Sequence, residues 1–263
     1  DWSSDVCSSD LDAAGQVSVV SGDGTYDGVR DFSDSVLRLD PQTLAVKDSY
    51  SPTDNSAIDA ADEDLGSAGA VLLPDQPGST PRLAVIGTKD GRIALLNRDR
   101  LGQAVQSLPK GTVGTGVSWG EVNWLGQFGA PAWFNQRLYF WGYQDVLKVF
   151  TLSQGLLNPT PQKGSVTYGY PGASVTVSAN GSSGAVVWAI RPSSTGAGLL
   201  QAYDALTLQA LYSSDQNAGD DMGLPARFTF PVVANGRVYV GGQTKLSVYG
   251  RRFNLFGKWV PLY

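Results

Sequence analysis

Ser35-Val-Leu-Arg-Leu-Asp40 is the first of five stretches that share one pattern, a short apolar strand that ends in a small or polar residue. The others are Arg92-Ile-Ala-Leu-Leu-Asn97, Val146-Leu-Lys-Val-Phe-Thr151, Leu199-Leu-Gln-Ala-Tyr-Asp204 and Lys245-Leu-Ser-Val-Tyr-Gly250. The last residues of successive stretches lie 57, 54, 53 and 46 positions apart. A repeat of roughly 40–50 residues that is filled with strands is typical of a β-propeller, in which four-stranded sheets (blades) pack around an axis. The sequence therefore predicts an all-β propeller with about five four-stranded blades.

Tight turns precede most of these strands at a constant position. Pro131-Ala-Trp-Phe-Asn135-Gln-Arg-Leu138-Tyr139 has the same internal spacing as Pro231-Val-Val-Ala-Asn235-Gly-Arg-Val238-Tyr239, and Asn180-Gly181 is a looser copy. Asn-Gly between two alternating apolar runs favours a type I′ hairpin turn, which needs positive φ at both central residues. A non-repetitive β-sandwich is the alternative, but a sandwich has no reason to keep the same order of features five times.

The first residues of the chain do not fit the repeat. Asp5-Val-Cys-Ser-Ser-Asp-Leu11 is the translation of a widely used sequencing adaptor read in reverse complement, and a native Ser/Asp-rich leader is the alternative. We therefore expect residues 1–11 to be an artefact, residues 12–250 to form the blades and residues 251–263 to be an off-period tail. On this interpretation Cys7 is not native and the chain is a fragment with an incomplete ring. We also expect Val17 to Val20 and Lys245 to Tyr249 to lack their natural neighbours.

Composition restricts the chemistry of the chain. It has no histidine, and Cys7 is its single cysteine, so a Ser-His-Asp triad, Cys-His proteolysis and His-ligated zinc are excluded for these residues. The 32 glycines, 14 prolines and charged fraction of 16% suit a turn-rich all-β protein. A net charge of −5 without a basic run argues against nucleic acid as a partner. No apolar stretch approaches the ~18 residues of a transmembrane segment.

An acidic stretch, residues 51–64, interrupts the strand pattern. Asp59, Asp62, Glu63 and Asp64 offer enough carboxylates for a calcium site, because Ca²⁺ takes about 6–8 oxygen ligands. Their spacing differs from that of a calcium-binding loop of the Asp-x-Asp-x-Asp-Gly type. A solvated acidic loop is therefore the favoured interpretation, and calcium is the alternative.

Two further irregular stretches suggest sites only weakly. Residues 21–28 are rich in Gly and Asp, but no Lys-Ser/Thr follows them, so a turn between strands is favoured over a phosphate-binding loop. Trp119 and Trp124 lie among glycines. We expect them to be buried between blades, with ligand stacking on exposed rings as the alternative.

The stretch Ala202-Tyr-Asp204-Ala-Leu-Thr207 resembles the blade motif Ala-x-Asp-x-x-Thr-Gly-Lys-x-x-Trp of pyrroloquinoline quinone-dependent dehydrogenases. Leu208 replaces the glycine of the motif and Tyr212 replaces its tryptophan. Other stretches of the chain resemble the same enzymes or the secreted bacterial quinone-like repeat propellers. They are Leu39-Asp40-Pro-Gln-Thr43-Leu44, Lys89-Asp90-Gly91-Arg92, Asn97-Arg98-Asp99, Gly129-Ala-Pro131-Ala-Trp-Phe134-Asn135 and Tyr170-Pro-Gly-Ala173.

What the resemblance implies is a quinoprotein-like fold more than an activity. The dehydrogenases carry a catalytic aspartate where this chain has Gly28 or Val29, and Asp31 is the nearest carboxylate. Matches to their adjacent cysteines and to their calcium and quinone ligands are missing, so no catalytic, cofactor-binding or metal-binding residue is assigned. We expect a non-catalytic binding or assembly scaffold, secreted or periplasmic. The alternative is a fragment of a pyrroloquinoline quinone- and calcium-dependent alcohol or sugar dehydrogenase.

Overall fold

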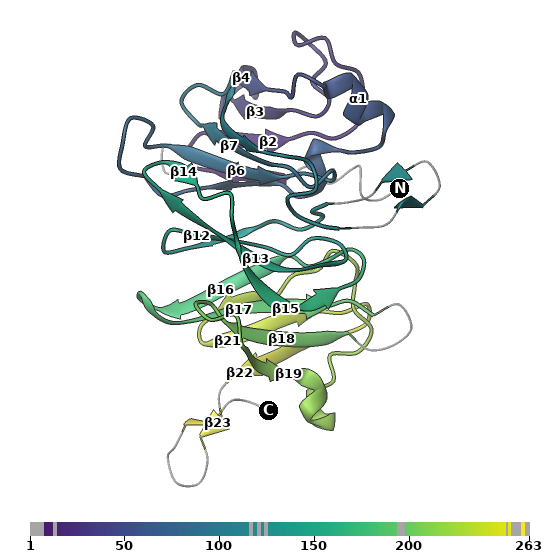
Figure 1. Ribbon diagram of the computed structural model, residues 1–263. Coiled ribbons are helices and arrows are strands. Elements are labelled where there is room, and N and C mark those ends of the chain that lie inside the picture. Colours follow the sequence, from purple (N-terminus) through teal and green to yellow (C-terminus); the bar gives the residue numbers. More distant parts are fainter. Residues whose placement is uncertain are drawn as a thin grey trace.

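The computed structural model of the chain describes residues 8–12, 15–115, 118–119, 122–123, 126–193, 198–250, 252–253 and 259–260. Its sheets follow one another along the sequence, from the purple N-terminal sheet at the top of Figure 1 to the yellow C-terminal one. The all-β prediction is confirmed. No helix in the described ranges has the length and apolar character needed to cross a membrane.

Five antiparallel sheets make up the fold, and the first four contain at least four strands each. The first has β1 (Ser8–Leu11), β2 (Val17–Val20), β3 (Val36–Leu39) and β4 (Val46–Tyr50), and the second has β5 (Ala70–Leu72), β6 (Leu83–Gly87), β7 (Ile93–Asn97) and β8 (Ala104–Leu108). The third has β11 (Ala132–Phe134), β12 (Arg137–Phe140), β13 (Asp145–Ser153), β14 (Leu156–Leu157) and β15 (Gln162–Tyr168). The fourth has β16 (Val175–Asn180), β17 (Ser183–Arg191), β18 (Leu199–Asp204) and β19 (Ala210–Ser213), and the fifth has β20 (Val232–Ala234), β21 (Arg237–Gly241) and β22 (Leu246–Gly250).

Short elements lie between and after the sheets. They are the helix α1 (Asn55–Ala60), the 3₁₀ turns η1 (Leu65–Ser67), η2 (Ser214–Gln216) and η3 (Ala218–Asp220), and the strand pairs β9 (Ser118–Trp119) with β10 (Val122–Asn123) and β23 (Arg252–Phe253) with β24 (Trp259–Val260).

The five repeated stretches occupy equivalent positions, as predicted. They form β3, β7, β13, β18 and β22, and each is the third strand of its sheet. In each sheet the third strand pairs with the second strand. In the first four sheets it also pairs with the last strand of the sheet. The sequence period therefore corresponds to one blade.

The core lies between consecutive blades and follows from the two-residue period of a strand. In β7, Ile93 and Leu95 belong to an apolar cluster shared with the third sheet, whereas Ala94 and Leu96 belong to one shared with the first sheet. Two further clusters join the third sheet to the fourth and the fourth to the fifth. Apolar side chains thus alternate between the two faces of each sheet, so that both faces of the inner blades are buried.

Burial of the repeated strands fails at the last of them. Leu246 and Val248 of β22 are 65% and 46% exposed, because no further sheet covers this face within the described ranges. The prediction that all five strands are largely buried is therefore wrong for β22. No strand pairing joins the first sheet to the fifth in the part of the chain that the structure describes, so no closed ring forms there.

The expectation that Val17 to Val20 lack natural neighbours stays a prediction, because one of their two neighbours belongs to the segment expected to be an artefact. These residues form β2, which pairs with β3 on one side and with Ser8–Leu11 on the other. Most of the tail expected at residues 251–263 lies outside the described residues. The assignment of residues 1–11 as an artefact stays a prediction.

Two of the three predicted hairpin turns have the expected backbone. φ is 46° and 61° at Asn135 and Gln136, and 51° and 72° at Asn235 and Gly236. The third copy differs, since Asn180 pairs with Ser183 as part of the strands and only Gly181 of the pair has positive φ.

Antiparallel order decides which loops meet. In each sheet the turns from first to second strand and from third to fourth lie at one end, whereas the connections from second to third strand and to the next sheet lie at the other. We call this second end the loop face. Backbone hydrogen bonds join its loops from sheet to sheet, from Lys89 N to Asp64 O, Gln127 N to Thr88 O and Ala173 N to Trp141 O.

Candidate functional site

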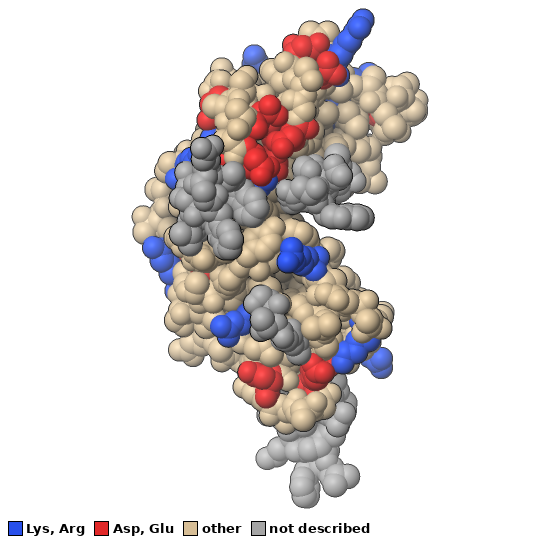
Figure 2. All heavy atoms as spheres, turned by 90° about the vertical axis from the view of Figure 1, so that its right-hand side faces the viewer, with Lys and Arg blue, Asp and Glu red and all other residues tan. Residues whose placement is uncertain are grey.

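A group of aspartates gathers where three connections of the loop face meet. Asp23 and Asp34 come from the β2–β3 loop, and Asp59, Asp62 and Asp64 come from the β4–β5 connection. Carboxylate oxygens of Asp23, Asp34 and Asp59 lie within 4.8 Å of one another, and so do those of Asp23, Asp62 and Asp64. We call these five aspartates, together with Lys89, the acidic centre. Figure 2 shows carboxylates gathered in the upper part of this face, over the N-terminal sheets.

Close backbone packing brings the first two connections together. A Cβ atom on Gly66 would lie 2.8 Å from the carbonyl carbon and oxygen of Ser21, so the two loops touch only because residue 66 is glycine. Asp34 stabilises the same contact. Its N–H donates to Gly22 O within the β2–β3 loop, and its Oδ1 accepts from the N–H of Leu65 in the β4–β5 connection. The sequence therefore builds the acidic centre from two loops whose aspartates are at least 25 residues apart.

Lys89 supplies positive charge to one side of the acidic centre. Its ammonium lies 2.5 Å from Asp62 Oδ1 and 2.8 Å from Asp64 Oδ2, and its side chain is 1% exposed. Burial disfavours the charged ammonium, but the hydrogen bonds to Asp62 and Asp64 outweigh it and raise the pKa of Lys89 above its usual range. This half of the acidic centre is thus an internally compensated buried ion pair.

The other half has no such compensation in the described ranges, where no basic side chain pairs with Asp23, Asp34 or Asp59. Asp34 is fully buried, and no donor reaches its Oδ2; Asp64 is fully buried as well, and no donor reaches its Oδ1. Burial raises the pKa of Asp34 to about 6, against the lowering effect of the Leu65 N–H. Loss of solvent, followed by the contact with Asp64, raises the pKa of Asp23 to about 8.

Several acidic residues that the sequence singled out lie outside this centre. Glu63 forms an ion pair with Lys110 instead, so that only Asp59, Asp62 and Asp64 of the four carboxylates considered for calcium lie in the acidic centre, and calcium binding there stays a prediction. Asp31 is exposed, and its carboxylate belongs to neither group of the acidic centre. Asp31 is therefore not assigned as a dehydrogenase base, and we derive no reaction step through a quinone.

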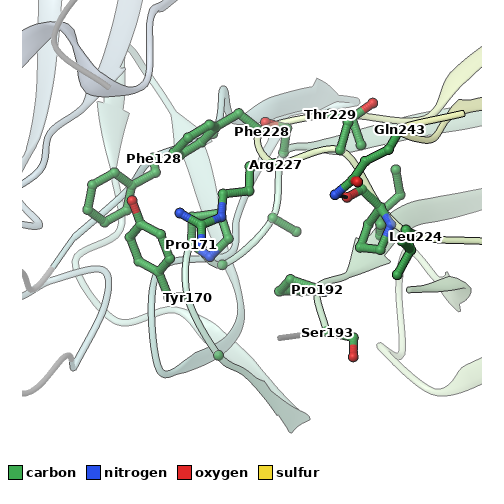
Figure 3. A pocket seen from close by; sticks show the side chains of 18 residues that line it. Phe128, Tyr170, Pro171, Pro192, Ser193, Leu224, Arg227, Phe228, Thr229 and Gln243 are labelled. Atoms are coloured by element: carbon green, nitrogen blue, oxygen red, sulfur yellow. Dashed lines mark hydrogen bonds between the residues drawn. The ribbon is translucent and has the colours of Figure 1, made fainter. Parts of the chain in front are cut away.

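A pocket of about 520 Å³ lies on the same loop face, among the connections of the third, fourth and fifth sheets. Its aromatic side consists of Phe128, Tyr170 and Phe228, whose rings meet edge to face around Tyr170 at centroid distances of 5.3 and 6.3 Å. Leu224, Pro192 and Gln243 line its far side (Figure 3). We call this cavity the aromatic pocket.

Arg227 is the charged side chain of the aromatic pocket. Its guanidinium carbon lies 6.0 Å from the centroid of the Tyr170 ring, and the side chain is exposed. No carboxylate forms an ion pair with Arg227 among the residues that the structure describes. Figure 3 shows its side chain extending toward Tyr170 and Pro171. An exposed guanidinium beside aromatic rings can bind an anion that carries an apolar group.

The acidic centre and the aromatic pocket are near enough to act on each other electrostatically. Burial raises the pKa of Tyr170, and the charges of Arg227, Lys89 and Asp62 modify the effect. One face of the protein therefore carries an acidic region over the first two sheets and a cationic, aromatic one over the last three.

Other sequence predictions for this face have mixed outcomes. Residues 21–28 form a turn between strands, as predicted, but this turn contributes Asp23 to the acidic centre. Trp119 is part of β9, Trp124 lies outside the described residues, and burial of the two rings between blades stays a prediction. The sequence did not single out Asp34, Arg227 or Phe228.

Comparison with known proteins places the chain by its fold. No protein-family model matches it, and no curated protein matches it. Among solved structures, the β-propeller domain of Cps50 (Swd1) from Myceliophteria thermophila superposes with a TM-score of 0.50 at 10% identity, covering 92% of this chain and 64% of that one. The chain is therefore a β-propeller protein.

Two propeller-like structures are similar at a slightly lower score. BamB from Moraxella catarrhalis has a TM-score of 0.49 and 18% identity, with 93% of this chain and 60% of that chain covered. Quinohemoprotein alcohol dehydrogenase from Comamonas testosteroni has a TM-score of 0.49 and 14% identity, with 94% and 44% covered. The chain thus spans less than two thirds of each of these proteins. Likenesses at such identities carry no conclusion about activity.

Proposed function

We propose that the protein is a non-catalytic β-propeller that binds a ligand in the aromatic pocket and serves as a binding or assembly scaffold outside the cytoplasm. The observation that carries the proposal is the exposed guanidinium of Arg227 over Tyr170 at the wall of the pocket. Low charge content and the resemblance to secreted quinone-like repeat propellers support the extracellular or periplasmic location.

The size and lining of the pocket support ligand binding. Ligand sites are typically concave, with volumes of roughly 300–1,000 Å³, and combine apolar walls with a few placed polar groups. The aromatic pocket has a volume of about 520 Å³, and its apolar wall is formed by Phe128 and Phe228. These rings would contact an aromatic or branched apolar group of the ligand, because removing the large apolar surface of such a group from water is favourable.

Charge selects the polar end of this ligand. Arg227 favours a carboxylate, with which a guanidinium forms two parallel hydrogen bonds. An apolar side chain next to a carboxylate is the chemistry of a polypeptide C-terminus that ends in a residue such as phenylalanine. The ligand is therefore the C-terminal residue of a partner protein. Nucleic acid is not a partner on this proposal, since the chain has a net charge of −5 and no run of basic residues that could follow a phosphate backbone.

Peptides test the proposal directly. Calorimetric titration of the full chain should detect binding of a pentapeptide ending in Phe with a free carboxylate. The same peptide as its C-terminal amide should bind at least about tenfold more weakly, since a hydrogen bond to a charged group contributes roughly 1.5–3 kcal/mol. The Arg227→Gln variant should lose the difference between acid and amide.

Arg100 provides the matched control, because it is an exposed arginine beyond the third strand of the second sheet, at the end opposite the loop face. Arg100→Gln removes the same charge and should leave peptide binding unchanged. Equal binding of acid and amide, or no binding of either, contradicts the proposal. So does reduction of a dye by alcohols or sugars after addition of pyrroloquinoline quinone and Ca²⁺, if Asp31→Ala abolishes it, because that result indicates a dehydrogenase.

A further inference from the structure

The Asp23–Asp34–Asp59 side of the acidic centre holds three carboxylates and no bonded cation among the described residues. Two of its oxygens already have backbone donors, since the N–H of Gly24 donates to Asp59 Oδ1 at 3.1 Å and that of Leu65 donates to Asp34 Oδ1 at 2.8 Å. These bonds fix the orientation of both carboxylates. They leave one oxygen of each for another partner.

The second carboxylate oxygen of Asp34, Oδ2, indicates that this further partner is a cation. Asp34 is fully buried, and its Oδ2 has no hydrogen-bond donor. A buried carboxylate oxygen without a partner is strongly unfavourable, because it has lost its hydration and gained nothing in return. The orphaned oxygen belongs to a residue whose carboxylate lies within 4.8 Å of those of Asp23 and Asp59. A cation bound at this position would contact the carboxylates of all three residues.

Charge balance leads to the same conclusion. The acidic centre has five carboxylates and one ammonium, and within this centre the Lys89 ammonium forms its ion pairs with Asp62 and Asp64. The carboxylates of Asp23, Asp34 and Asp59 form no ion pair with Lys89, and a positive charge placed between them would compensate their mutual repulsion.

We propose that Asp23, Asp34 and Asp59 bind one calcium ion, which joins the β2–β3 loop to helix α1 of the β4–β5 connection. The ligands are all oxygens, and the sequence has no histidine, which disfavours zinc and copper. Oxygens bound to one Ca²⁺ at about 2.3–2.6 Å can be up to roughly 5 Å apart, which the observed spacing meets. Mg²⁺ demands near-ideal octahedral geometry and usually keeps several waters, whereas Ca²⁺ accepts several protein carboxylates in a flexible arrangement. The site is independent of the aromatic pocket and of any catalytic role.

The full chain can be studied with and without calcium to test the proposed site. After treatment with a chelator, the protein should bind Ca²⁺ in a calorimetric titration with one-to-one stoichiometry, and its melting temperature should rise with Ca²⁺ concentration. Asp34→Asn and Asp59→Asn should each weaken this binding by at least about tenfold, since each removes one charged ligand of a site whose affinity follows ligand charge. Asp34→Asn retains an oxygen that can accept from Leu65, so the loop contact is preserved.

Asp31→Asn is the control, because Asp31 lies in the same β2–β3 loop and its exposed carboxylate is outside both groups. This variant should bind Ca²⁺ as the unchanged protein does. Asp59→Asn, at a half-buried position, provides the measurement if Asp34→Asn does not fold. No binding of Ca²⁺ at about 1 mM, the weak end of extracellular calcium sites, would overturn the proposal. Tighter binding of Mg²⁺ than of Ca²⁺, or equal loss in Asp31→Asn, would overturn it as well.

Discussion

Leu44 and Leu208 occupy the same position in two blades, and both have a left-handed backbone, with φ of 58° and 61°. Each follows an Asp-x-x-Thr turn in which the carboxylate of Asp40 or Asp204 accepts backbone N–H groups. The resembling dehydrogenase motif has glycine here, and glycine adopts this conformation without strain. The two leucines differ in burial, since Leu44 is 63% exposed and Leu208 is 5% exposed.

Glycine should therefore have opposite effects at these two positions. Leu44→Gly is expected to raise the free energy of unfolding by about 0.5–1 kcal/mol, because the relief of left-handed strain exceeds the extra backbone entropy of glycine. Leu208→Gly is expected to lower it by roughly 2–4 kcal/mol, since its side chain packs between the third and fourth sheets. Urea unfolding measures both. Destabilisation by Leu44→Gly would mean that the turn is not strained.

Gly66 should not tolerate even one methyl group. Gly66→Ala places a Cβ 2.8 Å from the backbone of Ser21, so that the two loops must separate, and overpacking of this kind costs about 1–3 kcal/mol. Because Asp23 is two residues beyond Ser21, the variant should also weaken Ca²⁺ binding. The control is Gly102→Ala, where nothing lies within 4 Å of the added Cβ. Equal stability of the two variants would contradict the close contact.

Much of the fold could be predicted because a propeller repeats one local pattern. The third strand of each blade is apolar and ends at a turn, which made β3, β7, β13, β18 and β22 visible in the sequence. Burial of each strand could not be predicted in the same way, since it depends on the neighbouring sheet. Leu95 and Val248 come from equivalent strands, yet the former is buried and the latter is 46% exposed.

The candidate sites were harder to predict than the blades. Asp59, Asp62 and Asp64 are close in the sequence, so their charge density indicated a possible cation site. Asp23 and Asp34 join them only through the contact between two loops, which local sequence does not reveal. A faint signal was present, because Asp34 lies between two serines, two residues before β3 begins. The aromatic pocket gave no signal, since its residues come from loops up to about a hundred positions apart.

Removal of Lys89 should show how strongly its ion pair is buried. Lys89→Met leaves Asp64 fully buried without a cation, and breaking a buried ion pair in this way typically costs 3–5 kcal/mol, roughly what we expect here. The double variant Lys89→Met/Asp64→Asn removes the charge as well and should recover much of the loss. A double-mutant cycle by urea unfolding measures the coupling. Additive effects of the two substitutions would indicate that the residues do not interact.

Asp204 should make stability depend on acid pH. Three hydrogen bonds hold the pKa of Asp204 below its ordinary value of 3.8. The backbone N–H of Thr207 has the largest effect, and the N–H of Leu206 and the hydroxyl of Thr207 add to it. A carboxyl whose pKa is lowered by folding contributes stability that is fully present above the unfolded pKa and is lost as the pH falls through the folded pKa.

Asp204→Asn should therefore be less stable than the unchanged protein at neutral pH, and the difference should shrink as the pH falls from about 4 toward 2. The reason is that protonated Asp204 and asparagine are both neutral acceptors in the turn. Urea unfolding over this pH range measures the difference. Asp215→Asn is the control, because the exposed Asp215 side chain accepts no hydrogen bond among the described residues, so that this variant removes a charge without leaving a turn donor unsatisfied. A difference for Asp204→Asn that stays constant from neutral to acid pH would contradict the role of its charge.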